Sequence, residues 1–167
     1  MSRAFVKESD DDLSAGELPE RPIPAHPNYV TAKGLELLQA RVRELSERHE
    51  QLKREAPDVS ESKQKLREVE RDLRYFRAQL ERATVVDTAQ QPRDEVHFGA
   101  VVKIEDEEGN VQTFTLVGDD EADVTRGRIS WAAPLARAMI GAKIGDSVVW
   151  QRPAGEAEVS IVDITYV

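Results

Sequence analysis

The chain's architecture follows from residues 31–56, which read TAKGLELLQARVRELSERHEQLKREA. Within this stretch, seam residues recur at alternating spacings of three and four: Leu35, Leu38, Val42, Leu45, His49 and Leu52. This heptad spacing is typical of a helix that packs in a coiled coil. Thr31 is a residue type favoured at a helix N-cap. At about 1.5 Å per residue, the helix that it begins has a predicted length of about 38 Å.

A second run with the same alternation follows directly. It consists of Leu66, Val69, Leu73, Phe76, Leu80 and Ala83. Between the two runs, Ala56-Pro57 predicts a helix stop, and Asp58 can cap a new helix. Two helices joined by so short a turn must lie antiparallel. Residues 31–85 therefore predict a coiled-coil hairpin with its tip near residues 56–62.

The tip carries two carboxylates three positions apart, Asp58 and Glu61. One interpretation is purely structural, because Asp58 as N-cap and Glu61 three residues later form a capping-box-like pair. The other interpretation is functional, since a rigid hairpin would present both acids at its far end.

The segments on either side of the hairpin have a different composition. Residues 1–30 combine the acidic run 10–12 with four prolines, which predicts a flexible acidic, proline-rich arm. Residues 86–95 include the polar stretch Gln90-Gln91-Pro92-Arg93 and predict a linker between domains.

From residue 96 to residue 167 the hydrophobic period becomes that of strands. A hairpin is predicted from 101–104 and 111–117, with its turn near Gly109. Further strands are predicted at 128–131, 148–150 and 158–166, and a short helix follows Pro134 and ends at Gly141. The predicted fold class is therefore α+β, with an antiparallel sheet wrapped around one helix behind the coiled-coil hairpin.

Composition excludes several kinds of site and location. The 167 residues include no cysteine, which excludes disulfides, thiolate zinc sites and cysteine nucleophiles. The three histidines, His26, His49 and His97, lie in different segments, so no local histidine metal cluster is indicated. No apolar run approaches the roughly 18 residues of a membrane span, and the first residues lack a secretory signal. We therefore expect a cytoplasmic protein with no membrane partner.

The net charge of −9 is unevenly distributed. Residues 31–85 hold thirteen basic and eleven acidic residues, whereas residues 86–167 hold seven basic and fifteen acidic ones. An acidic C-terminal domain would be repelled by phosphate backbones. We therefore do not expect binding to free duplex DNA. We expect this domain to dock on a basic protein surface instead.

Several short segments of the C-terminal part stand in a characteristic order. They are Phe98-Gly99-Ala100-Val101-Val102, Val117-Gly118-Asp119-Asp120-Glu121-Ala122-Asp123, Ile129-Ser130, Pro134-Leu135-Ala136-Arg137-Ala138, Ile140-Gly141, Gly145-Asp146 and Pro153-Ala154-Gly155-Glu156. In this order they resemble the Gre family of bacterial transcript-cleavage factors, GreA and GreB. The hairpin is similar to that family through Thr31, Gly34, the heptads and Val85-Val86-Asp87. Residues 1–28 have no counterpart in the usual family pattern.

The resemblance implies a fold and an activity. The C-terminal domain would be FKBP-like and would dock on RNA polymerase, while the coiled coil enters the secondary channel. Asp58-Val59-Ser60-Glu61 matches the family's Asp-x-x-Glu motif, whose acids help the polymerase hold a second Mg²⁺ and a water. The polymerase then cleaves its own backtracked RNA. The chain would thus have no cofactor of its own, share Mg²⁺ through Asp58 and Glu61, and not be an enzyme in isolation.

Within this framework, further residues have expected roles. The expected polymerase contacts are Asp119, Asp120, Glu121, Ala133, Pro134 and Arg137. Lys53, Arg54, Lys63 and Lys65 are expected to face the nascent RNA 3′ end. For the basic residues, a solvated helix face is the competing interpretation. For the acidic ones it is an ordinary surface loop.

The chain also departs from the family pattern. Pro57, Ser62 and Lys65 stand where the family usually has glycine, asparagine and a nearby aromatic residue. Each helical arm is shorter by roughly one heptad, which removes about 10 Å of reach. Ala132-Ala133 replaces the usual acidic-serine pair before Pro134.

Three functions remain open from the sequence. The first is a cleavage-stimulating elongation factor that binds polymerase as a monomer. The second is a secondary-channel regulator that docks without stimulating cleavage and affects initiation or elongation. The third, a prolyl isomerase, is suggested only by the FKBP-like architecture, and the aromatic content of 5% is low for an apolar proline pocket.

Overall fold

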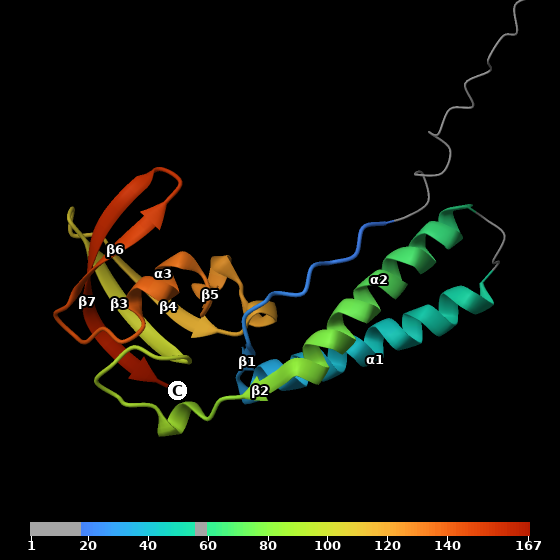
Figure 1. Ribbon diagram of the computed structural model, residues 1–167, viewed down its shortest axis with the longest axis horizontal. Coiled ribbons are helices and arrows are strands. Elements are labelled where there is room, and N and C mark those ends of the chain that lie inside the picture. The colour runs from blue at the N-terminus through green and yellow to red at the C-terminus, as the bar shows by residue number, and fades with distance from the viewer. Residues whose placement is uncertain (1–17, 56–59) are drawn as a thin grey trace, which may run out of the picture.

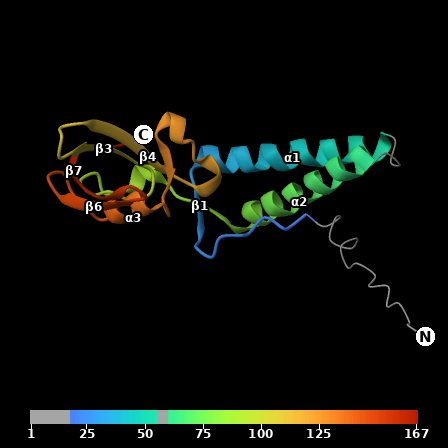
Figure 2. The same cartoon turned by 90° about the horizontal axis from the view of Figure 1, so that it is seen from above.

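The structure, a computed structural model, describes residues 18–55 and 60–167. Two antiparallel helices extend from a curled sheet (Figure 1), and the same two bodies are seen from above in Figure 2. The helices are α1, Ala32–Arg54, and α2, Ser60–Arg82, each of 23 residues. This arrangement confirms the predicted coiled-coil hairpin, which we call the rod. The predicted stop at Pro57 and the predicted cap at Asp58 lie outside the described residues.

The rod forms because its apolar residues share one face of each helix. Leu38, Leu45, Leu52 and Leu73 are buried between α1 and α2, as their heptad positions require. The hydroxyl of Thr31 accepts a hydrogen bond of 3.0 Å from the Gly34 N–H and so caps the first helix.

Residues 18–30, which we call the strap, lie beside α2 in an extended conformation (Figure 1). Their last three residues form β1, Asn28–Val30, which pairs in parallel with β2, Ala83–Val85. The structure thus differs from the predicted flexible arm for residues 18–30, because charged and polar side chains on α2 bind this segment. Residues 1–17 lie outside the described part of the chain.

The C-terminal sheet has five strands in the order β5-β4-β3-β7-β6. Their bounds are β3, Ala100–Asp106; β4, Val111–Val117; β5, Arg128–Ser130; β6, Ser147–Arg152; and β7, Gly155–Tyr166. The predicted β3–β4 hairpin is confirmed, with Gly109 at a φ of 83° in its turn.

One edge of the sheet departs from the antiparallel prediction. Strand β5 pairs with β4 in parallel. Between these strands the chain turns back through two 3-10 helices, η3, Asp119–Glu121, and η4, Val124–Arg126. This return places Arg128 beside Thr115, so β5 runs alongside the last three residues of β4 in the same direction. The α+β class still holds, with a mixed sheet.

The core of this domain lies where the sheet curls around α3, Pro134–Met139 (Figure 1). Leu135, Ala136 and Met139 of α3 are at most 4% exposed and pack among buried sheet residues such as Leu116 and Ile161. Pro134 occupies the start of α3. A backbone N–H at this position has no hydrogen-bond partner within the helix, so its absence in proline loses no helical hydrogen bond. In the described part of the chain, no helix is both long and apolar enough to cross a membrane.

Candidate functional site

The far end of the rod presents an exposed carboxylate. Glu61 lies in the first turn of α2, and its Oε1 accepts a hydrogen bond of 2.7 Å from Lys65 Nζ. This hydrogen bond, with the charge of Lys65, lowers the pKa of Glu61. Glu61 is therefore an exposed carboxylate that favours its ionised form and already has a cationic partner. Asp58, its predicted companion, lies outside the described residues.

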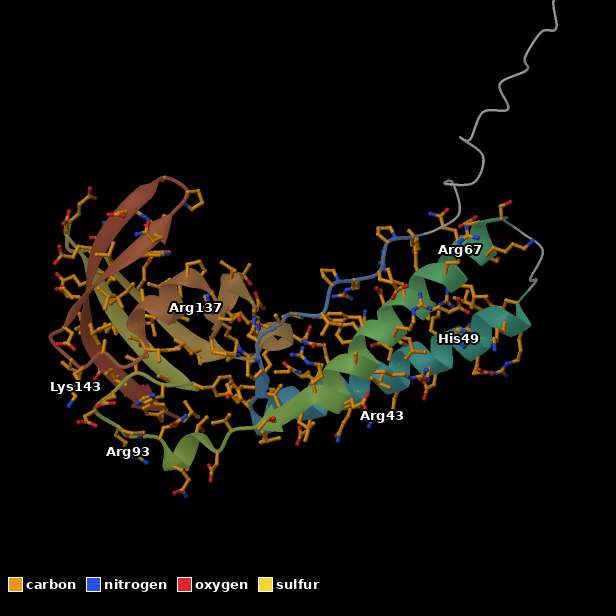
Figure 3. The ribbon with its side chains drawn as sticks, in the orientation of Figure 1. Arg43, His49, Arg67, Arg93, Arg137 and Lys143 are labelled. Atoms are coloured by element: carbon orange, nitrogen blue, oxygen red, sulfur yellow. The ribbon has the colours of Figure 1, made fainter. Side chains whose placement is uncertain are left out.

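Basic side chains surround this end of the rod. Lys53 and Arg54 are exposed in the last turn of α1, and Lys63 and Lys65 are exposed near the start of α2. Arg67, labelled in Figure 3, lies on the same part of α2. The structure thus brings the four predicted RNA-facing residues to one end of the rod, where phosphate oxygens would meet positive charge.

The opposite end of the rod joins the C-terminal domain through η3. The three residues of η3 are all acidic, and each binds a different element. We call this set of contacts the joint. Glu121 is only 5% exposed and accepts hydrogen bonds from the Thr31 N–H at 3.1 Å and the Gly118 N–H at 3.0 Å. The Thr31 hydroxyl also donates to Glu121. These donors compensate the buried carboxylate and attach η3 to the start of α1.

Asp120 binds α2. It accepts hydrogen bonds from the Tyr75 hydroxyl at 2.8 Å and from Gln79 Nε2 at 2.9 Å. Gln79 is fully buried. Burial, together with the hydrogen bond to Asp120, raises the pKa of Tyr75 to about 12. Tyr75 is thus held in its neutral, donating form at physiological pH.

Asp119 binds the strap and the sheet. The Nε2 of His26 lies 2.6 Å from Asp119 Oδ2, and the Ser130 hydroxyl donates to Asp119 Oδ1 at 2.5 Å. The His26 ring also packs edge-on against Trp131, with centroids 5.3 Å apart. Polymerase contact by the three η3 acids stays a prediction, but in this structure their carboxylates are engaged inside the molecule.

The remaining predicted docking residues lie on or beside α3. Pro134 and Arg137 are exposed, and Ala133 is half-buried at the N-cap of the helix. Arg137 lies on the C-terminal domain (Figure 3). Ile140, just after the helix, is 39% exposed and adds an apolar side chain to this surface. Helix α3 therefore offers a free surface, in contrast to η3.

Sequence reasoning missed the residues of α2 that bind the joint and the strap. Asp72, Tyr75, Gln79 and Arg82 stand at spacings of three, four and three, which places them on a second stripe beside the hydrophobic seam. That spacing was a signal for a second binding face on α2. Its partners are 41 to 56 residues away in sequence, so the pattern alone does not identify them.

The described residues contain no group of three or more His, Asp or Glu side chains that could hold a metal ion. His49 binds Glu70 across the rod at 3.0 Å, and His97 binds Glu95 at 3.0 Å, so each ring contacts a nearby carboxylate. Glu61 is a hard oxygen donor of the kind Mg²⁺ prefers, and it can supply one ligand of a shared site.

Comparison with known proteins gives consistent matches. Residues 91–166 match the family model for the C-terminal domain of the transcription elongation factors GreA and GreB. GreB of Neisseria meningitidis serogroup B is 40% identical over 111 residues, which cover 66% of this chain and 68% of that protein. GreB of Haemophilus ducreyi is 32% identical over 161 residues, covering 85% of this chain and 96% of that protein.

A solved structure is also similar. The solved structure of the prokaryotic transcription elongation factor GreA/GreB from Nitrosomonas europaea is 26% identical in sequence to this chain. The match covers 83% of this chain and 99% of the Nitrosomonas chain, with a TM-score of 0.41.

Proposed function

Because this chain belongs to the GreA/GreB family of transcription elongation factors, we propose that it binds RNA polymerase and stimulates cleavage of backtracked RNA. In this proposal the C-terminal domain docks at the rim of the secondary channel and the rod enters the channel. The chain acts in the cytoplasm, has no catalytic activity alone and does not bind free duplex DNA.

One observation carries the proposal: the exposed surface of α3 lies on the C-terminal domain, whereas Glu61 lies at the far end of the rod. Each helix of 23 residues spans about 35 Å at 1.5 Å per residue. A protein docked by α3 could therefore present a carboxylate well inside a channel.

At the active centre, the proposed role of this chain's residues is limited and specific. Glu61 and Asp58 would supply oxygen ligands to a Mg²⁺ ion shared with the polymerase, which activates water for attack on RNA phosphate. Lys53, Arg54 and Lys63 would stabilise the phosphates of the nascent RNA 3′ end. Lys65 Nζ donates to Oε1 of Glu61, and the second carboxylate oxygen, Oε2, would remain available to the metal ion.

Docking is proposed to use Pro134 and Arg137, with Ala133 at the edge of the contact. The carboxylates of Asp119, Asp120 and Glu121 have internal partners. We therefore assign them a supporting role at the joint, with a direct polymerase contact only through their remaining exposed edges.

A second function is favoured by the ion pair between Glu61 and Lys65. Lys65 partly neutralises the carboxylate that the cleavage mechanism needs. If that pair persists in the complex, the protein would occupy the channel without stimulating cleavage and would regulate initiation or elongation.

The deciding experiment uses a stalled, backtracked transcription complex with 3′-labelled RNA and Mg²⁺. Wild-type protein is compared with Asp58→Ala, Glu61→Ala and, as matched control, Glu47→Ala, which removes an exposed carboxylate from the middle of α1. We expect short labelled fragments with wild type and Glu47→Ala, and none above background with the two tip variants. Polymerase binding without any fragment release by wild type would contradict cleavage and support the regulator.

A further inference from the structure

The strap contacts the rod and the C-terminal domain at the same time. Towards its start, Glu20 accepts hydrogen bonds of 2.5 and 3.1 Å from Arg74, and the Arg21 guanidinium lies 3.9 Å from the centre of the Tyr75 ring. The Glu20–Arg74 pair is exposed to solvent, which screens the attraction between the two charges. These contacts guide the strap along α2, but they do not by themselves fix it.

The stronger contacts are at the joint end of the strap. The carbonyl of His26 accepts a hydrogen bond of 2.5 Å from Arg82, and Asn28 Nδ2 donates to the carbonyl of Gln79 at 2.8 Å. The His26 ring contacts Asp119 and Trp131 of the C-terminal domain. One residue, His26, therefore binds α2 through its backbone and the C-terminal domain through its side chain.

This double contact matters because the covalent link between the two bodies is a single segment. Residues 86–95 connect β2 to the C-terminal domain, with one short 3-10 helix, η2, Thr88–Gln90. A single connection allows rotation, so non-covalent contacts must set the angle of the rod. Glu121 and Asp120 attach η3 to α1 and α2.

The strap adds a third attachment, in which His26 contacts Asp119 and Trp131. The nearby Tyr29 packs on Trp131 and Phe98. Three attachments define an orientation, and of these strap contacts with the C-terminal domain the His26 contact is the one that involves a charged partner, Asp119.

A small change of this angle has a large effect at the tip. For a rod about 35 Å long, a rotation of about 10° at the joint moves the far end by about 6 Å. Displacements of about 1 Å at a reacting centre can already cost about 100-fold in rate. The contacts that set the angle at the joint therefore determine where Glu61 is presented.

We propose that His26 is a positioning residue: through the strap it holds the rod at the angle that brings Glu61 to the polymerase active centre. The inference rests on the proposed function, since it concerns the same site. Most of the strap, including His26, belongs to residues 1–28, for which the sequence indicated no counterpart in the family pattern.

The first test measures the angle in the free protein. The chain has no cysteine, so Glu47→Cys on α1 and Glu158→Cys on β7, both exposed, accept a pair of nitroxide labels. The distance distribution between the labels is recorded by pulsed electron paramagnetic resonance. We expect one narrow distribution for the otherwise wild-type protein and a broadened or shifted one for His26→Ala. In His26→Gln the amide still donates to Asp119, so the narrow distribution should return.

The matched control is His49→Ala, which removes a histidine–carboxylate contact of similar length inside the rod, that with Glu70. It should leave the distance distribution unchanged. A wild-type distribution in His26→Ala, with cooperative thermal unfolding showing a folded protein, would overturn the proposal. Equal broadening in His26→Ala and His49→Ala would do so too, because the effect would then come from the rod.

The second test is the cleavage assay over a range of protein concentrations. His26→Ala should lower the maximal cleavage rate about tenfold, a modest misplacement effect, and leave the half-saturating concentration unchanged. His26→Gln should restore the rate. An unchanged maximal rate in His26→Ala would overturn the positioning role. Absence of cleavage by wild type would instead contradict the proposed function, and the label distances would still decide the role of the strap in setting the angle.

Discussion

At the scale of single residues, Gly34 leaves the space that the Glu121 carboxyl group occupies at the joint. A Cβ built on Gly34 would overlap the carboxyl group of Glu121. Gly34 is in the first turn of α1 and its N–H donates to Thr31. The absence of a side chain at this position is therefore what lets the buried carboxylate approach the start of the helix.

This packing predicts the sign of a mutation. In an ordinary helix, Gly→Ala stabilises by about 1 kcal/mol. Here we expect Gly34→Ala to destabilise the protein by about 1 to 3 kcal/mol, because the methyl group must displace Glu121 from its donors. Urea unfolding followed by circular dichroism measures the difference.

The control is a double-mutant cycle with Glu121→Ala, which by itself leaves buried donors unpaired and should cost about 2 kcal/mol. In the Glu121→Ala background, Gly34→Ala should no longer destabilise, because the carboxylate that it would meet is gone. Additive losses from the two mutations would contradict the assignment of the effect to this contact.

The pair Glu61–Lys65 predicts a pKa change at the tip. Lys65 lowers the pKa of Glu61 from its usual value of 4.5. The carboxylate is thus more than half ionised at pH 4.5, and its interaction with Lys65 is lost as the pH falls through the lowered pKa. We expect Lys65→Gln to raise the pKa of Glu61 towards 4.5, measured by NMR titration of the side-chain carboxyl carbon.

A matched control for this titration is Lys53→Gln, which removes an exposed tip lysine from the other helix. It should leave the pKa of Glu61 nearly unchanged. An equal shift in both variants would mean that the general charge of the tip, and not the hydrogen bond from Lys65, sets the pKa.

At the scale of elements, the two helices depend on a narrow apolar seam. Much of each helix surface is exposed and charged, and Leu38 at 2% exposure is one of the few fully buried side chains of α1. Leu37, the next residue, is 45% exposed. Both residues are leucine and have the same helix propensity, but one is buried and the other is exposed. Comparing substitutions at the two positions therefore distinguishes the effect of packing on stability from the effect of helix propensity.

We expect Leu38→Ala to lower the free energy of unfolding by about 2 to 4 kcal/mol, because it leaves a cavity in the seam. Leu37→Ala should change it by about 0.5 kcal/mol or less. Chemical unfolding of both variants provides the measurement. Comparable losses in the two variants would show that α1 is not stabilised by the seam as described.

At the scale of the whole molecule, the rod satisfies its own seam, since α1 packs on α2 of the same chain. The joint likewise uses partners within one chain, and the C-terminal domain has its own buried core. A second copy is therefore not needed to cover either body.

We accordingly expect a monomer of 18.7 kDa in light scattering after size-exclusion chromatography, over a tenfold range of protein concentration. Leu37→Ala serves as a control, because an exposed leucine could promote weak association at high concentration. A mass of twice this value for both proteins would contradict the monomer and indicate exchange or pairing of rods.

The sequence by itself determined the features that depend on local periodicity. Heptads in 31–56 and 66–83 predict both helices, Gly109 predicts the β3–β4 turn, and Pro134 predicts the start of α3, all as observed. Each signal is contained within a few turns of helix or one strand pair, where spacing and propensity decide the backbone.

Only the tertiary structure decided how distant segments meet. The acids 119–121 look alike in sequence, yet they bind three different elements, with partners 90, 45 and 93 residues away for Glu121, Asp120 and Asp119. The parallel direction of β5 and the docking of the strap on α2 are also contacts between segments that no local pattern relates. Such contacts depend on which surfaces the folded elements bring together and on the burial of polar groups that then must be paired, and local spacing carries no information about either.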